Sequence, residues 1–109
     1  MKKLFIAAFM FVSTFTSNVF ADGHAIKMGI ILGFTGPIES LTPAMAASAE
    51  LAFKEASDSG SLLGGKKIEV VRADSTCVDS AAATAAAEGV IAQGVAAIMG
   101  ADCSGVTGA

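Results

Sequence analysis

The feature that most constrains the fold is the alternation of short apolar runs with longer segments of helical character. The runs IKMGIIL (26–32), KIEVVRAD (67–74) and VAAIMG (95–100) are short and rich in β-branched residues, as buried strands are. Strands that alternate with helices form a parallel sheet joined by right-handed crossovers. The sequence therefore predicts an α/β fold, an open parallel sheet with flanking helices.

The first helix is expected within residues 42–60. Thr42 can act as its N-cap, Pro43 suits the first helical position, and Gly60 can end the helix. Apolar residues inside this segment recur at the spacing of one helix face, which supports the assignment. Examples are Met45, Ala49 and Phe53.

The second helix is expected within residues 79–94, where Asp79 or Ser80 is the candidate N-cap and Gly94 is the stop signal. A third helix is expected to open within residues 101–109. Alanine and glycine are frequent in these segments, and such small side chains let a helix pack close to a sheet. The expected order is strand, helix, strand, helix, strand and the start of a helix.

Residues 1–21 have the pattern of an export signal that is removed by cleavage. Lys2 and Lys3 give a positive start, residues 4–12 form an unbroken apolar run, and small residues precede a cleavage point after Ala21. A membrane anchor is the alternative, but a spanning helix needs about 20 apolar residues, and polar residues interrupt this run too early. We therefore expect a cleaved signal and a remaining chain, residues 22–109, that is not embedded in the membrane.

The mature chain is expected to be an acidic protein of the Gram-negative periplasm. No cysteine directly follows the apolar run, so the run lacks a lipid attachment site. The whole chain has 7 basic and 10 acidic residues, and cleavage removes Lys2 and Lys3. This acidic balance argues against a nucleic-acid partner, because binding to a phosphate backbone needs a clustered basic surface.

The two cysteines of the chain, Cys77 and Cys103, are an even number in an oxidising compartment. A disulfide between them is the economical interpretation, and a pair of free buried thiols is the alternative. A catalytic cysteine has less support, because the only histidine, His24, lies near the expected new N-terminus. The sequence shows no catalytic constellation, and we expect no enzyme activity.

Ligands of open parallel sheets bind beyond the carboxyl ends of the strands. Three segments follow the expected strands there, at residues 33–43, 73–79 and 101–105. In the last of them, the Ser104 hydroxyl and the N–H groups that follow it, including that of Gly105, suit an anion such as a carboxylate. The alternative is that Ser104 serves only as the N-cap of the third helix.

The remaining glycines and aspartates do not match a known cofactor or metal motif. Gly29, Gly33 and Gly36 lack the G-x-G-x-x-G spacing of dinucleotide-binding loops, and a Walker A motif is missing, so we interpret these glycines as turn formers. Three aspartates near the expected strand ends lack the alternate spacing of a calcium loop, and we expect them to be caps or solvent-facing residues. They are Asp74, Asp79 and Asp102. No metal or cofactor is therefore expected.

Four stretches, taken in their order, point to a known family. They are IKMGIILGFTGPI, LLGGKKIEVVRAD, DSTCVDSAAATAAAEGVI and IMGADCSG. With them, residues 26–109 resemble the N-terminal lobe of a type I periplasmic solute-binding protein, and within that family they are most similar to the leucine/isoleucine/valine-binding proteins of ABC transporters. The resemblance implies two α/β lobes that close on a small ligand, and a disulfide between the two cysteines. It also implies that residues 22–109 are part of one lobe, truncated inside the third helix.

The resemblance also implies roles for individual residues. In that family the serine after the second cysteine holds the α-amino-acid head group, a role that maps onto Ser104, beside Gly105. Leu41 stands where leucine-binding members place an aromatic residue in the pocket, and Asp102 stands where they have an apolar residue. The Asp102 carboxylate is expected either to pair with a ligand ammonium group or to face solvent. Leucine, isoleucine or valine is the expected ligand, with other amino acids, amides and ureas open.

The sequence therefore predicts the substrate-binding component of an ABC transporter, which captures an amino acid in the periplasm and delivers it to an inner-membrane permease. The alternative is a ligand-sensing receptor or regulatory domain of the same fold, which a following transmembrane helix and signalling domain would favour. An exported enzyme would require a catalytic cluster that this sequence does not show.

Overall fold

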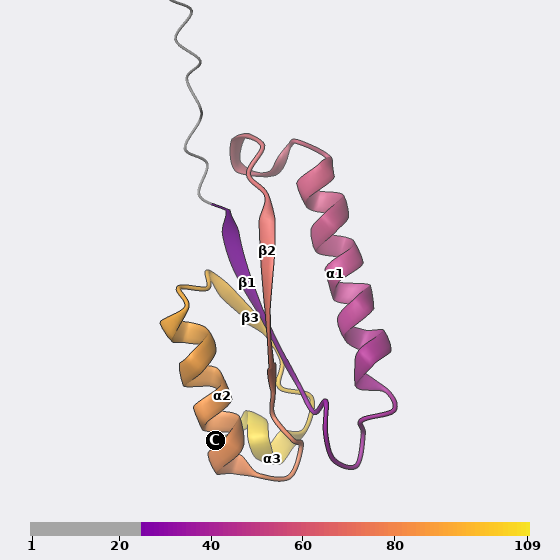
Figure 1. Ribbon diagram of the computed structural model, residues 1–109, viewed down its shortest axis with the longest axis vertical. Coiled ribbons are helices and arrows are strands. Elements are labelled where there is room, and N and C mark those ends of the chain that lie inside the picture. Colours follow the sequence, from indigo (N-terminus) through magenta and orange to yellow (C-terminus); the bar gives the residue numbers. More distant parts are fainter. Residues whose placement is uncertain (1–24) are drawn as a thin grey trace, which may run out of the picture.

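The structure, a computed structural model, describes residues 25–109, and the expected export signal lies outside them. Within these residues, strands alternate with helices in the predicted order (Figure 1). None of the described helices is long and apolar enough to cross a membrane. The elements are β1 (Ile26–Leu32), α1 (Thr42–Asp58), the 3₁₀ turn η1 (Leu62–Gly64), β2 (Ile68–Asp74), α2 (Ser80–Ala92), β3 (Ala97–Met99) and α3 (Ser104–Thr107).

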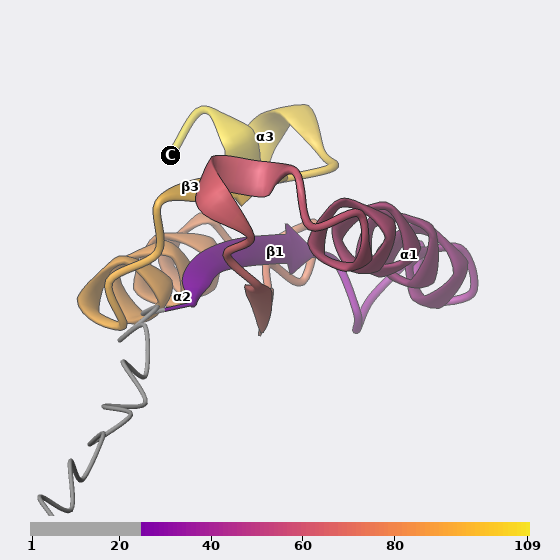
Figure 2. The same cartoon turned by 90° about the horizontal axis from the view of Figure 1, so that it is seen from above.

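The strands form one parallel sheet in the order β2-β1-β3, so the first strand is central. Ile26 pairs with Ile68 on the β2 side, and Met28 pairs with Ala97 on the β3 side. The chain crosses to one side of β1 through α1 and returns to the other side through α2. Right-handed crossovers in opposite directions place their helices on opposite faces, as Figure 2 shows for α1 and α2. The predicted α/β fold is confirmed.

The core is built around the central strand. Ile30 and Leu32 are buried on one face of β1 and pack against Ala46 of α1. Ile31 points to the other face, where Ala83 of α2 is also buried. Because side chains alternate along a strand, only a strand covered on both faces buries consecutive apolar residues. The uninterrupted apolar run of β1 is therefore explained by its central position between two helices.

The start of α1 differs from the prediction. Its N-cap residue is Leu41, which makes no side-chain capping bond, and Thr42 is already helical. Thr42 is fully buried, and its hydroxyl donates a hydrogen bond to the carbonyl oxygen of Gly33 at 3.0 Å. The hydroxyl ties the helix to the residue that follows β1 and does not cap the helix. Pro43 stands in the first turn, as predicted.

The start of α2 follows the prediction. Asp79 is the N-cap, and its carboxylate accepts hydrogen bonds from the N–H groups of Ala81 at 2.9 Å and Ala82 at 3.1 Å. These two groups have no partner inside the helix, so the aspartate satisfies them. Ser80 is the first helical residue, and Gly94 follows the C-cap with a φ of 75°. A left-handed glycine at this place ends the helix, as expected.

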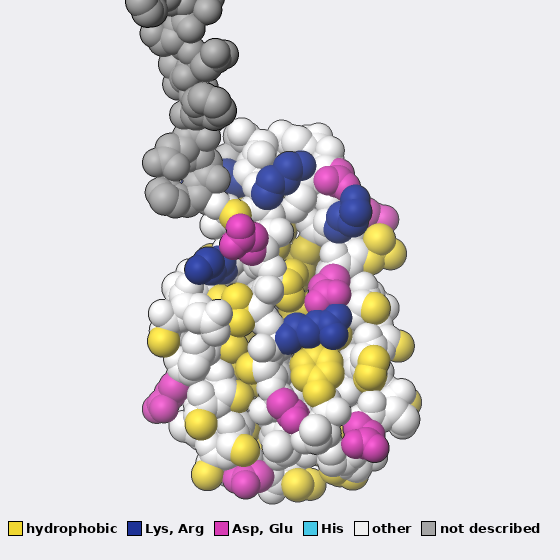
Figure 3. Space-filling view, in the orientation of Figure 1, with side chains coloured by type: hydrophobic (Ala, Val, Ile, Leu, Met, Phe, Trp, Pro, Cys, Tyr) yellow, Lys and Arg dark blue, Asp and Glu magenta, His cyan; other side chains and the backbone are white. Residues whose placement is uncertain are grey.

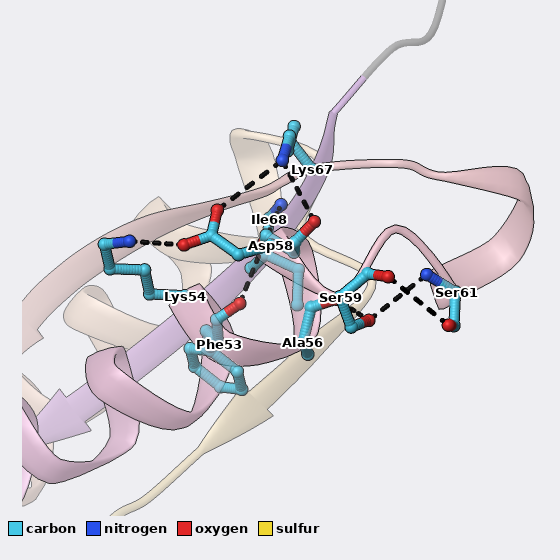
Figure 4. A network of polar contacts seen from close by, with 9 residues as sticks. Phe53, Lys54, Ala56, Asp58, Ser59, Ser61, Lys67 and Ile68 are labelled. Atoms are coloured by element: carbon cyan, nitrogen blue, oxygen red, sulfur yellow. Dashed lines mark hydrogen bonds and ion pairs between the residues drawn. The ribbon is translucent and has the colours of Figure 1, made fainter.

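A polar network joins the end of α1 to the start of β2 (Figure 4). Lys67 pairs with Asp58 at 3.6 Å and donates a hydrogen bond to the Ser57 carbonyl oxygen at 3.0 Å, while Lys54 pairs with the same aspartate. The buried Ser57 hydroxyl accepts a hydrogen bond from the Ile68 N–H at 2.9 Å. Exposed ion pairs contribute little to stability, so the buried serine is the contact that orients the strand.

A second contact fixes α1 on the sheet near the middle of β2. The Arg72 guanidinium donates two hydrogen bonds to the Glu50 carboxylate of α1, at 2.6 and 2.7 Å. It also lies over the Phe34 ring, 5.5 Å from the ring centre. A two-point arginine–carboxylate pair has a defined geometry. The pair therefore anchors the helix and, through Phe34, the segment that follows β1.

Candidate functional site

Three loops meet where the parallel strands end, at the lower end of the sheet in Figure 1. The first loop (residues 33–41) follows β1, the second (75–79) follows β2, and the third (100–103) follows β3. Ligands of open α/β sheets bind at this end of the strands. The structure thus brings together the segments that the sequence predicted as the binding edge.

Asp102 of the third loop reaches both other loops. One carboxylate oxygen accepts a hydrogen bond from the Gly33 N–H at 2.9 Å, and the other accepts one from the Ser75 hydroxyl at 3.3 Å. Ser75 is fully buried, and its own N–H donates to the Leu32 carbonyl oxygen at 2.9 Å. Both oxygens of Asp102 therefore have partners inside the protein, an arrangement that the sequence analysis did not anticipate.

The disulfide between Cys77 and Cys103 is confirmed, with 5.3 Å between the two Cα atoms. It joins the second loop to the third, next to the Asp102 contacts. Thr76 and Cys77 both have positive φ values, 58° and 69°. Such a conformation is uncommon for residues other than glycine and persists where the surroundings hold it. The second loop is therefore held in a shape that its own residue types do not favour.

The first loop packs closely on the second at Gly36. This glycine has a φ of 95°, and a side chain built there would overlap the carbonyl oxygen of Thr76. Only glycine combines a positive φ with so close an approach of another backbone. The turn-former interpretation of Gly36 is confirmed, with the added reason that the neighbouring loop occupies the space of a Cβ atom.

Asp74, the last residue of β2, also fastens the first loop to the second. Its carboxylate accepts hydrogen bonds from the Thr35 hydroxyl at 2.5 Å, the Thr35 N–H at 3.3 Å and the Thr76 N–H at 2.8 Å. Burial by itself raises the pKa of this carboxyl. The hydrogen bonds, of which that from the Thr35 hydroxyl is the strongest influence, favour the charged form and bring the pKa below its ordinary value of 3.8.

We expect Asp74→Asn to lower the free energy of unfolding by about 1 kcal/mol at pH 7. A carboxyl whose pKa is lowered by folding stabilises the fold above its unfolded pKa, and this contribution is lost as the pH falls through its folded pKa. The difference between wild type and variant should therefore be largest above pH 4 and shrink below it. Denaturant unfolding at pH 7, 4 and 2.5 measures it, and a difference that is independent of pH would contradict the assignment.

Ser104 is the first residue of α3, and it is exposed. The N-cap of this helix is Cys103, without a side-chain capping bond, so the interpretation of Ser104 as the N-cap is wrong. The turn is held instead by the Thr107 hydroxyl, which contacts the carbonyl oxygens of Ala101 and Cys103 at 2.9 Å each. The Ser104 hydroxyl is thus not used to cap α3. Its neighbour Gly105 is also exposed.

Leu41 lies at the end of the first loop, at the same end of the sheet as Ser104. Leu41 is 61% exposed, and other leucines, Leu51 (57%) and Leu63 (70%), are similarly exposed, so its exposure does not by itself mark a binding site. The three aspartates of the sequence analysis have different roles: Asp79 caps α2, as expected, whereas Asp74 and Asp102 bind neighbouring loops. Within residues 25–109, no cluster of histidine, cysteine and acidic residues could hold a metal ion.

The charged side chains are distributed unequally along the sheet. In Figure 3 the lysine and arginine side chains lie in the upper part and the middle of the view, away from its lower end, where the three loops lie. The basic residues between positions 25 and 109 are Lys27, Lys54, Lys66, Lys67 and Arg72. None of these residues lies in the three loops. The three loops therefore contain hydroxyl and N–H donors and no basic residue.

A cavity of about 260 Å³ lies on the face of the sheet beside α2. Most of its walls are apolar side chains, among them Ile31, Ile98 and Val106. Burying a charge without polar partners is costly. The loops, which present hydroxyl and N–H groups, therefore suit a charged ligand better than this cavity does.

A comparison with models of protein families finds a match. A family model described as "Periplasmic binding protein" matches residues 25–109, which are all the residues that the structure describes. A search of curated proteins found no match. The matched segment contains all three loops and the disulfide.

Proposed function

Because the chain belongs to the periplasmic binding protein family, we propose that it is the substrate-binding component of an ABC transporter. It captures an amino acid in the Gram-negative periplasm, after cleavage of the export signal, and delivers it to an inner-membrane permease. The observation that carries this proposal is the family match over residues 25–109. The fold supports this proposal. Three loops, joined by hydrogen bonds and a disulfide, lie at the end of the strands where open α/β sheets bind their ligands.

The proposed ligand contacts come from the end of the first loop and from the start of α3. Ser104 donates its hydroxyl, and Gly105 its N–H, to the ligand carboxylate, while Leu41 forms part of the wall for the ligand side chain. Two observations support this assignment: the Ser104 hydroxyl does not cap α3, and the described loops contain no basic residue. First-turn N–H groups have no partner inside their helix and are free to bind an anion.

The proposed ligand class is a branched-chain amino acid: leucine, isoleucine or valine. An aliphatic wall at Leu41 suits an aliphatic ligand side chain. Thermal unfolding of the full-length protein with each common amino acid, acetamide and urea tests this class. A stabilisation by leucine, isoleucine or valine is expected, because a ligand that binds only the folded state raises the unfolding temperature. A protein that none of these compounds stabilises would contradict the proposed function.

We expect Ser104→Ala to weaken leucine binding by roughly 1–3 kcal/mol, because the variant removes a hydrogen bond to a charged carboxylate. Isothermal titration calorimetry of the full-length protein with L-leucine measures the change. Ser61→Ala is the matched control, since Ser61 is an exposed serine beside η1, at the opposite end of the sheet. Equal affinities in wild type and both variants would remove Ser104 from the binding site.

A further inference from the structure

We infer that Asp102 is a positioning residue: it sets where Ser104 and Gly105 stand relative to the first loop and does not itself contact the ligand. The inference rests on the proposed function only in that it takes Ser104 and Gly105 as ligand contacts. It assigns a role to an acidic residue that stands at the proposed binding edge, where a charge could otherwise be taken for a ligand partner.

The contacts of Asp102 join positions that are far apart along the chain. Gly33 lies 69 residues away and follows β1, while Ser75 lies 27 residues away and follows β2. Each carboxylate oxygen faces one of these donors, at 2.9 and 3.3 Å. Asp102 is half-buried, so its hydrogen bonds are only partly exposed to competition from water. The side chain therefore acts as a bridge between all three loops.

The disulfide does not replace this bridge. It joins Cys77 and Cys103, and thus the second loop to the third. The ladder between β1 and β3 ends at the pair of Ile30 and Met99. Beyond that pair, Asp102 links the third loop to the first. Within residues 25–109, this link is the hydrogen bond that the Asp102 carboxylate accepts from the Gly33 N–H. Ser104 lies two residues after Asp102, so the bridge sets its place opposite the first loop.

Two substitutions separate the shape of the side chain from its charge. In Asp102→Asn the amide oxygen can accept from the Gly33 N–H, and the amide nitrogen can donate to the Ser75 hydroxyl oxygen, which is also an acceptor. The neutral variant therefore keeps both links. Asp102→Ala removes both and leaves the Gly33 N–H and the buried Ser75 hydroxyl without their partner. A ligand-binding carboxylate would require the charge, whereas a positioning residue requires only the links.

The first readout needs no ligand. In the full-length protein labelled with ¹⁵N-glycine, the amide signal of Gly105 reports on the turn that carries Ser104. We expect Asp102→Ala to move this signal and to speed hydrogen exchange at Gly33, while Asp102→Asn leaves the Gly105 signal in place. Ser75→Ala, which removes one link and leaves the carboxylate intact, should move the Gly105 signal in the same direction by less. It provides the comparison if Asp102→Ala does not fold.

The second readout is the affinity for L-leucine by calorimetry. Asp102→Ala is expected to weaken it about tenfold, and Asp102→Asn should restore it to within about twofold of wild type. An unmoved Gly105 signal in Asp102→Ala and Ser75→Ala would overturn the inference. So would a large loss of affinity in Asp102→Asn with Gly105 unmoved, because the charge would then contact leucine. A wild-type protein that does not bind leucine would count against the proposed ligand class, and the Gly105 signals would still decide the role of Asp102.

Discussion

Gly100→Ala is expected to lower the free energy of unfolding by about 4 kcal/mol or more, an exceptional effect for one methyl group. Gly100 has a φ of 132°, a conformation that residues with a Cβ atom rarely adopt. A Cβ atom there would overlap the Ile31 carbonyl group, with the carbonyl carbon only 2.8 Å away. The obstacle is the backbone of the central strand, so neither a rotamer change nor a small shift relieves it.

The matched control for this substitution is Gly89→Ala. Gly89 lies inside α2, is exposed, and has nothing within 4 Å of the place of its Cβ atom. Alanine is favoured over glycine in a helix by about 0.5–1 kcal/mol, so this variant should be as stable as wild type or slightly more so. Chemical denaturation followed by circular dichroism compares the three proteins. A Gly100→Ala protein as stable as the Gly89→Ala protein would show that the third loop does not pack on β1 in this way.

Removal of the disulfide is expected to cost roughly 3–4 kcal/mol in the double variant Cys77→Ala, Cys103→Ala. The bond links residues that are 26 positions apart, and it limits the freedom of the unfolded chain by closing that loop. It also holds the second loop, where Thr76 and Cys77 have positive φ values. In addition to this loss of stability, we expect the loops at the binding edge to become more mobile in the folded protein.

Two comparisons test this second prediction. Reduction of the wild-type protein should lower its stability by about as much as the double variant loses, because both remove the same bond. Alkylation of the exported wild-type protein should label neither Cys77 nor Cys103 until a reductant is added, since the structure describes no free cysteine. Labelling without reductant, or a double variant as stable as wild type, would contradict the structural role of the bond.

The helix starts show how far local sequence patterns reach. Asp79 has the chemistry of an N-cap, and its partners are the next N–H groups along the chain, so a local rule predicts it correctly. Thr42 has similar chemistry, but its hydroxyl binds the Gly33 carbonyl oxygen, which the turn of the first loop brings close. Ser104 was open to two interpretations from its sequence, and only the structure shows that it does not cap α3.

The amino-acid sequence by itself determined the order of strands and helices, the parallel sheet and the edge at which the loops meet, and it favoured a disulfide between the two cysteines. These features follow from short-range periodicity and from a single available cysteine partner. Only the tertiary structure decided what Thr42, Ser75 and Asp102 bind. The physical reason is that the partners of Ser75 and Asp102 come from other loops, and strand pairing places distant positions such as Gly33 and Asp102 within hydrogen-bond distance, which no local pattern records.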